Sequence, residues 1–177
     1  MRIQEHIKIS SAAALMALPW LKKEVWIPLA ASLLIDVDHY LWYAITHRTL
    51  KLGEALKFFN QADPPQTAAM KAFHHPLFLG ILLFLAVRFR SRFLWLVLAG
   101  LLFHVGLDVV HITQMSKLKY TLSEQAEHLC SDCGRYEAAL QLHTVDFASN
   151  LLERYHSKHF VVLCPECHER SHAPVEV

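Results

Sequence analysis

Four apolar runs separated by polar segments fill the first two thirds of the chain. They cover Ser10–Leu18, Val25–Ile45, Leu77–Val87 and Phe93–Ile112. Apolar runs of this kind are typical of buried or lipid-facing helices. The second and fourth runs approach the length that crosses a bilayer core of ~30 Å, and the first and third are shorter. The pattern therefore predicts a mainly α fold, a helical bundle embedded in a membrane.

Aromatic and basic residues lie where a membrane interface would place them. Trp20, Trp26, Trp42 and Tyr43 flank the first two runs, as in aromatic belts. Lys22-Lys23 and the turn from Arg88 to Arg92 would share one side of a four-helix arrangement, the cytoplasmic side by the positive-inside rule. That topology would place the cysteine-rich tail outside the cytoplasm, where reduced cysteines do not persist. We therefore expect that one of the four runs does not span the membrane.

The fourth run carries three ionisable residues on one helical face. His104, Asp108 and His111 stand at positions i, i+4 and i+7. Such groups are costly among apolar residues unless a partner satisfies them. A divalent metal ion would satisfy them, and so would hydrogen bonds between the two histidines and Asp108. Asp36 and His39, at i and i+3 in the second run, repeat the pattern.

Composition and charge narrow the choice of partners. The chain has 177 residues, of which 54% are hydrophobic and 19% charged, and it holds 13 histidines. Eleven Lys and Arg against seven Asp and Glu give residues 1–115 a charge of +4, and six against nine give residues 116–177 a charge of −3. An acidic tail does not favour electrostatic attraction to nucleic acid. The histidine excess favours metal or proton chemistry.

All four cysteines lie in the tail as two Cys-x-x-Cys pairs. This spacing predicts a tetrahedral zinc site of four thiolates, formed by Cys130, Cys133, Cys164 and Cys167. A tail of this length cannot bury enough core to fold alone, so we expect the structural zinc to stabilise it.

The tail from Cys130 to His172 resembles the HNH endonuclease family, most specifically in its Cys-x-x-Cys-His-x-x-x-His ending. The resemblance implies a small ββα, treble-clef-like module in which His143, His168 and His172 bind a catalytic metal ion. Thr144 stands where the family has its general-base histidine, and threonine accepts no proton at neutral pH. His159 stands where the family has asparagine or aspartate. Nuclease catalysis would therefore require His143, His156 or His159 to take over the missing role.

Residues 1–112 resemble the bacterial membrane-bound metal-dependent hydrolases, which are related to zinc-dependent phospholipase C. The motifs are an early histidine, an Asp-x-Asp-His, a histidine that opens a later helix, and a His-x-x-x-Asp. Phe73-His74-His75-Pro76 departs from the Thr-His-Ser of that family, which leaves His74 as the alternative to His75. Asp36 or Asp38 would orient a catalytic water. The expected ligands of zinc or another divalent metal are His6, Asp36, His39, His75, His104, Asp108 and, from its place on the same face, His111.

Together these patterns predict three segments. They are a helical metal-dependent hydrolase-like domain at 1–115, a linker with a short helix at 116–129, and an HNH-like zinc module at 130–177. We expect hydrolysis of phosphoester bonds, in a phospholipid or a nucleic acid, at the inner (cytoplasmic) membrane of a bacterium. One alternative is a membrane-tethered HNH endonuclease that cleaves nucleic acid, with the helices as anchor. Others are a non-catalytic zinc docking module, and a hydrogen-bonded or ion-conducting polar core without hydrolysis.

Overall fold

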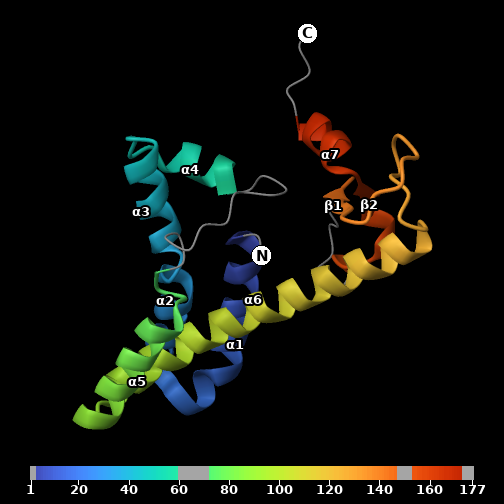
Figure 1. The fold of residues 1–177 in the computed structure, drawn as a ribbon. Helices are drawn as coiled ribbons and strands as arrows, with labels where there is room; N and C mark the ends of the chain where they lie inside the picture. The colour runs from blue at the N-terminus through green and yellow to red at the C-terminus, as the bar shows by residue number, and fades with distance from the viewer. Residues whose placement is uncertain (1–2, 60–71, 147–152, 173–177) are drawn as a thin grey trace. The chain divides into compact units, whose positions relative to one another are not determined.

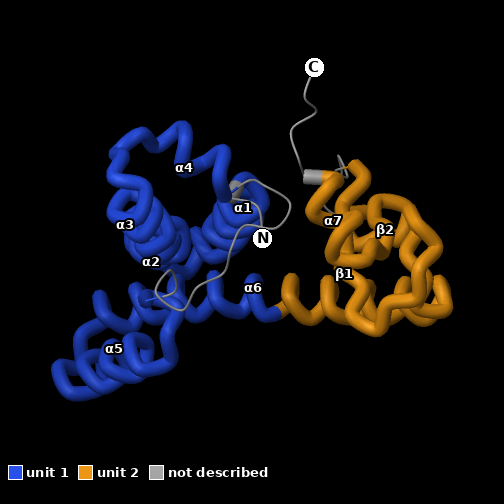
Figure 2. The backbone as a smooth tube through the Cα atoms, turned by 45° about the horizontal axis from the view of Figure 1, so that its top comes forward, with its two compact units in different colours: residues 1–109 blue, residues 110–177 orange. Residues whose placement is uncertain are grey.

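The computed structural model describes residues 3–59, 72–146 and 153–172, and the chain divides into two compact units. Unit 1 covers Met1–Val109 and unit 2 covers Val110–Val177 (Figures 1 and 2). Unit 1 is helical, and unit 2 adds a small two-stranded sheet. The predicted mainly α class is therefore confirmed.

Unit 1 consists of short helices and the first part of one long helix. They are α1 (Ile3–Leu21), the 3-10 turn η1 (Lys22–Val25), α2 (Trp26–Leu34), α3 (Val37–Thr46), α4 (Leu52–Phe59), α5 (Pro76–Phe89) and α6 (Arg92–Gln125). The second apolar run is not one helix, because the backbone leaves the helical conformation at Asp36 (φ −71°, ψ 1°) between α2 and α3. His6 lies inside α1 and not before it.

The long helix α6 replaces the predicted linker. It runs for 34 residues, so the expectation of a separate short helix within 116–129 is wrong. No proline interrupts this stretch. Leu122 on α6 and Ala126 just after it pack against the core of unit 2. This packing extends the helix beyond the end of the apolar run.

By length and composition, α6 is the one helix of the described residues that could cross a membrane. Only 22% of its most apolar window is buried inside the protein. The shorter apolar helix α5 does not reach the length of a span.

Helix α6 crosses α2 at very close range. A Cβ atom added to Gly100 would stand 2.2 Å from the carbonyl oxygen of Pro28. Gly106, less than two turns further along the same helix, has open space around its Cα atom. Only a residue without a side chain therefore fits at the crossing point.

We expect Gly100→Ala to destabilise unit 1 by about 1–3 kcal/mol, because the added methyl group meets backbone that cannot move aside. The matched variant Gly106→Ala should stabilise α6 by up to ~1 kcal/mol, since alanine is the better helix former. Thermal unfolding of the two detergent-purified variants measures the difference. Equal midpoints would contradict the close crossing.

Unit 2 is a ββα arrangement that packs on the end of α6. Strands β1 (Gln141–Thr144) and β2 (Phe160–Leu163) pair antiparallel, with Gln141 opposite Leu163. The 3-10 turn η4 (Ser157–His159) leads into β2, and α7 (Pro165–His172) follows it. The core contains three cysteines and three aliphatic side chains, namely Cys130, Leu140, Val162, Leu163, Cys164 and Cys167.

Candidate metal centres

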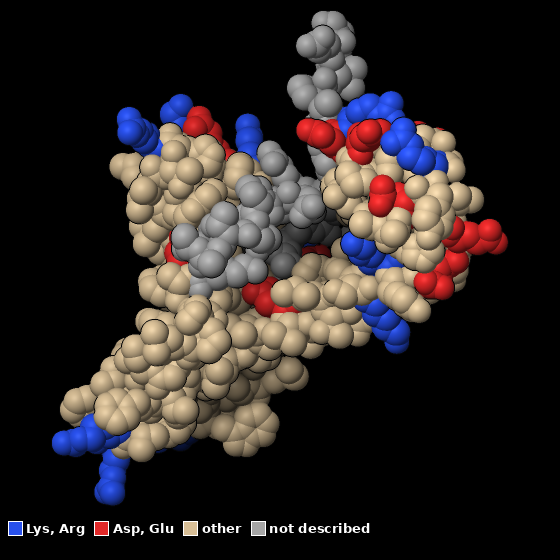
Figure 3. Space-filling model, viewed as in Figure 1, with Lys and Arg blue, Asp and Glu red and all other residues tan. Residues whose placement is uncertain are grey.

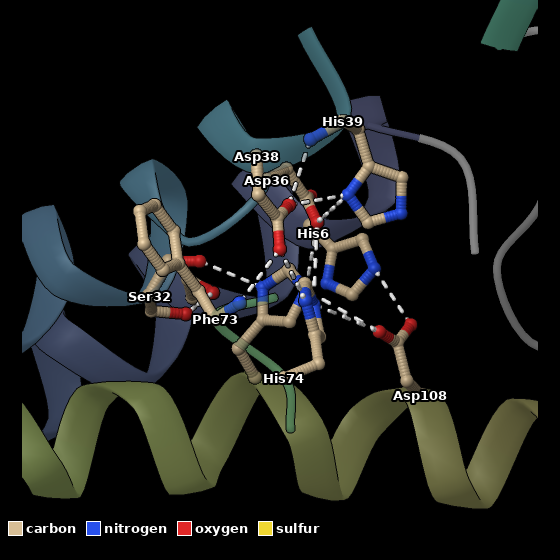
Figure 4. A network of polar contacts seen from close by, with 10 residues as sticks. His6, Ser32, Asp36, Asp38, His39, Phe73, His74 and Asp108 are labelled. Carbon is tan, nitrogen blue, oxygen red and sulfur yellow. Dashed lines mark hydrogen bonds and ion pairs between the residues drawn. The ribbon is translucent and has the colours of Figure 1, made fainter. Parts of the chain in front are cut away.

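Unit 1 brings ionisable side chains from four parts of the chain into one cluster (Figure 4). They come from α1, the break between α2 and α3 with the first turn of α3, the turn before α5, and the middle of α6. The cluster consists of His6, Asp36, Asp38, His39, His74, His104 and Asp108. Six of these seven residues were expected as ligands or catalytic groups, and His74 was the alternative to the expected ligand His75.

Four atoms at the heart of this cluster form imidazole–carboxylate pairs at close range. Asp36 Oδ1 lies 3.3 Å from His104 Nε2 and 3.5 Å from His74 Nε2. Asp108 Oδ2 lies 3.4 Å from His104 Nε2 and 3.8 Å from His74 Nε2. Bonds of 2.0–2.1 Å to a tetrahedral zinc ion would place neighbouring ligand atoms about 3.3–3.4 Å apart. These imidazole–carboxylate separations are close to those of ligands that share a divalent metal ion, and Asp36, His74 and His104 form one possible ligand group.

In His104 and His74, the hydrogen bonds are made by Nδ1 and leave Nε2 available to a metal ion. His104 Nδ1 donates to the carbonyl oxygen of Ser32 at 2.7 Å. His74 Nδ1 lies 3.3 Å from Asp38 Oδ2, to which it can donate. With the proton on Nδ1, each Nε2 carries a lone pair, the tautomer that metal-binding histidines use. Both Nε2 atoms are buried and make no hydrogen bond with any described residue.

Asp38 is positioned to orient histidines. Its carboxylate is buried and accepts the backbone N–H of Phe73 at 2.9 Å and that of His39 at 2.8 Å. His39 Nδ1 lies 2.6 Å from the same carboxylate, so Asp38 contacts both His39 and His74. A carboxylate behind a ligating imidazole fixes its ring and tautomer. The geometry favours this role for Asp38 over contact with a catalytic water.

His6 and His39 flank the four central atoms. His6 Nε2 lies 3.1 Å from Asp108 Oδ1, and its ring stacks on that of His104 with centroids 4.0 Å apart. His39 Nδ1 lies 3.8 Å from Asp36 Oδ1. His6, His104 and Asp108 form one possible ligand group, and Asp38, His39 and His74 form another. The cluster therefore contains three overlapping groups of potential ligands.

Two predicted ligands lie elsewhere. His75 is exposed and accepts the backbone N–H of Leu77 as the N-cap of α5, so the structure places His74 in the cluster instead. A signal in the sequence pointed this way, because Pro76 favours the first helical position and makes its predecessor the cap. His111 contacts Tyr155 and Arg154 within unit 2, at 3.0 and 3.1 Å.

The four cysteines of unit 2 form the second candidate centre. Their Sγ atoms all lie within 4.8 Å of one another, and Cys133 Sγ is 3.8 Å from Cys164 Sγ. Zinc–sulfur bonds of 2.3 Å would give neighbouring sulfurs in a tetrahedral site a separation of about 3.8 Å. The first pair lies in a tight turn that ends in the left-handed Gly134 (φ 67°). The second pair spans the end of β2 and the first turn of α7. The cluster thus has the form that holds a zinc ion.

Hydrogen-bond donors reach two of these sulfurs, and their effect differs: burial still raises the pKa of the Cys167 thiol to about 12. The backbone N–H of Cys164 donates to Cys130 Sγ at 3.2 Å, and Arg170 donates to Cys167 Sγ at 2.9 Å. Burial raises the pKa of the Cys130 thiol, but the backbone N–H groups of Cys133 and Cys164 outweigh it and bring the pKa to about 6. Cys130 is therefore prepared to bind a metal ion near neutral pH.

The histidines expected at an HNH-like metal site are brought together only in part. The rings of His143 on β1 and His168 on α7 lie 5.4 Å apart, edge to face. His159 contacts Asp146 through Nδ1. The side chain of His172 lies outside the described structure. Among the described side chains, no group of three potential ligands includes His143, His159 or His168.

No match was found when the chain was compared with protein families, curated proteins and solved structures. Both family resemblances therefore stay predictions. Inference about function must start from the geometry of the two clusters.

Proposed function

We propose that the chain is a membrane-bound, metal-dependent hydrolase that acts on phosphoester bonds. Its active centre is the cluster of unit 1, with Asp36, His74, His104 and Asp108 as ligands. The observation that carries this proposal is the set of 3.3–3.8 Å separations between two carboxylate oxygens and two lone-pair nitrogens. A hydrogen-bonded polar core would instead direct the Nε2–H groups of His74 and His104 at a carboxylate, and neither Nε2 makes a hydrogen bond with any described residue.

The exposure of the ligands indicates where a substrate enters. The His104 side chain is fully buried and that of His74 is 10% exposed, whereas those of Asp36 and Asp108 are 29% and 26% exposed. A phosphoester therefore approaches from the carboxylate side. A bound divalent metal ion supplies Lewis acidity toward the phosphoryl group and a water of lowered pKa. Asp38 and the Ser32 carbonyl hold the two imidazoles in place for it.

Unit 2 has a structural role in this proposal. Its four-cysteine site is closed, as structural zinc sites are, and leaves no position for a substrate. Thr144 at the end of β1 supplies no general base. Zinc in this site stabilises the ββα module around the end of α6.

Metal content and hydrolysis of a phosphodiester test the proposal together. Wild type should hold at least two zinc ions and hydrolyse bis(p-nitrophenyl) phosphate, a small activated diester. The double variant His104→Ala/Asp108→Ala should keep one zinc ion, in unit 2, and lose hydrolysis. Elemental analysis and release of nitrophenolate, both on detergent-purified protein, measure the two quantities.

His143→Ala serves as the matched variant in unit 2. It should retain hydrolysis, because the proposal places no reaction step there. One zinc ion in both wild type and the double variant would overturn the proposal. If His143→Ala loses hydrolysis and the double variant retains it, the activity belongs to an HNH-type centre in unit 2.

A further inference from the structure

Helix α5 is apolar on nearly every face and has little protein around it. The described structure buries a single side chain of this helix, that of Ala86. Leu77, Phe84 and Phe89 are 66%, 65% and 63% exposed. Other large apolar side chains of unit 1 are exposed as well, including Leu15, Met16 and Trp20 on α1 and Phe93, Trp95 and Leu102 on α6. An exposed apolar area of this extent is typical of a surface that contacts lipid or another protein.

Cations gather at one end of this apolar surface. Lys22 and Lys23 lie in η1, and Arg88, Arg90 and Arg92 lie around the turn from α5 to α6. The two turns are neighbours, because Arg92 pairs with Glu24 at 2.7 Å. Figure 3 shows cations at the end of α5, with uncharged surface covering the helices beyond them. Basic side chains at the end of an apolar layer suit a membrane interface with anionic headgroups.

The uncharged stretch has nearly the same length in four helices. At 1.5 Å per residue, Ile9–Leu21, Trp26–Ile35, Leu77–Val87 and Phe93–Phe103 rise about 14 to 18 Å each. One end of each stretch lies beside the cationic turns. The other end is close in the sequence to a residue of the metal cluster. A bilayer core is ~30 Å thick, so the cluster lies about half a core thickness from the cations.

Irregular backbone occurs at this same depth. Helices α2 and α3 are separated by the break at Asp36, and α5 begins at Pro76, just after His74. Within a membrane, interrupted helices are tolerated where protein or water satisfies the free backbone groups. Here the Ser32 carbonyl accepts from His104 and the Phe73 N–H donates to Asp38. Broken helices that meet at a polar site near the midplane are a known design of membrane proteins.

We propose that unit 1 lies in a lipid bilayer with its cationic turns at one interface and its metal cluster near the midplane. Lipid suits this surface better than a second copy of the chain, because exposed apolar side chains are distributed over three helices, α1, α5 and α6. The inference shares the membrane part of the proposed function but is independent of the hydrolysis.

Quenching of tryptophan fluorescence by brominated lipids measures this depth. In a background with Trp20, Trp26, Trp42 and Trp95 replaced by phenylalanine, two matched variants place the probe on α5. Leu77→Trp lies beside the cluster, and Phe89→Trp lies beside the cations. The proteins are reconstituted into phosphatidylcholine–phosphatidylglycerol vesicles, with bromine either near the chain end or near the glycerol backbone.

We expect the ratio of deep to shallow quenching to exceed one for Leu77→Trp and to fall below one for Phe89→Trp. Leu102→Trp and Phe93→Trp repeat the comparison on α6, in case a variant on α5 does not fold. Equal ratios within both pairs would overturn the proposed depth. Absence of quenching in folded, zinc-containing protein would assign the surface to a second copy. Hydrolysis without this quenching pattern would leave the proposed function intact and refute the depth.

Discussion

His74→Ala is expected to empty the metal centre of unit 1 and to abolish phosphodiester hydrolysis, whereas His75→Ala is expected to retain both. His74 Nε2 is buried beside Asp36 and Asp108, while the neighbouring His75 is exposed and caps α5. A metal ion supplies several kcal/mol of transition-state stabilisation, so its loss should lower kcat/KM by about 10³-fold or more. Zinc content and kcat/KM of the two variants provide the measurement.

The comparison of His74→Ala with His75→Ala is informative because the two histidines are adjacent in the sequence and chemically identical. Any general effect of removing an imidazole from this turn occurs in both variants. His75→Ala also loses a cap, which should cost about 0.5–2 kcal/mol of stability without loss of metal. A zinc content that falls in His75→Ala and stays unchanged in His74→Ala would refute the ligand assignment.

The existence of the cluster could be predicted from the sequence because its members interrupt apolar runs. Asp36 and Asp108 stand out among aliphatic neighbours, and a buried carboxylate without a partner would be costly. His104 and Asp108 also follow the i, i+4 spacing that places two ligands on one face. The four cysteines were equally visible, because paired Cys-x-x-Cys motifs have few other uses.

The roles within the cluster could not be predicted in the same way. Whether Asp38 contacts a metal ion or holds His74 depends on the break between α2 and α3, which turns Asp38 toward the backbone of Phe73. No glycine or proline marks that break, and apolar residues resume directly after His39. The full length of α6 could not be predicted for a related reason. Leu122 is held in the helix by contacts with the core of unit 2, most of which is distant in the sequence.

Cys164→Ser is expected to remove one zinc ion and to unfold the ββα module of unit 2. Cys164 is 2% exposed, and its sulfur and backbone N–H lie within the cysteine cluster. Serine keeps the size of the side chain but supplies no thiolate. Structural zinc contributes apparent free energies of about 10–16 kcal/mol in small zinc-binding domains, far more than the small core of unit 2 can replace. Elemental analysis and hydrogen exchange of β1, β2 and α7 measure the two effects.

Ser131→Ala is the matched control for this variant. Ser131 stands within the first Cys-x-x-Cys turn, where its side chain is exposed and its backbone N–H donates to the Val162 carbonyl oxygen. The control keeps that bond and all four thiolates, so zinc content and exchange protection should match those of wild type. Protection of β1 and β2 that survives in zinc-free Cys164→Ser would contradict a structural role for the metal. Retained metal in unit 1 of the same variant would separate the two centres, because their ligand sets share no residue.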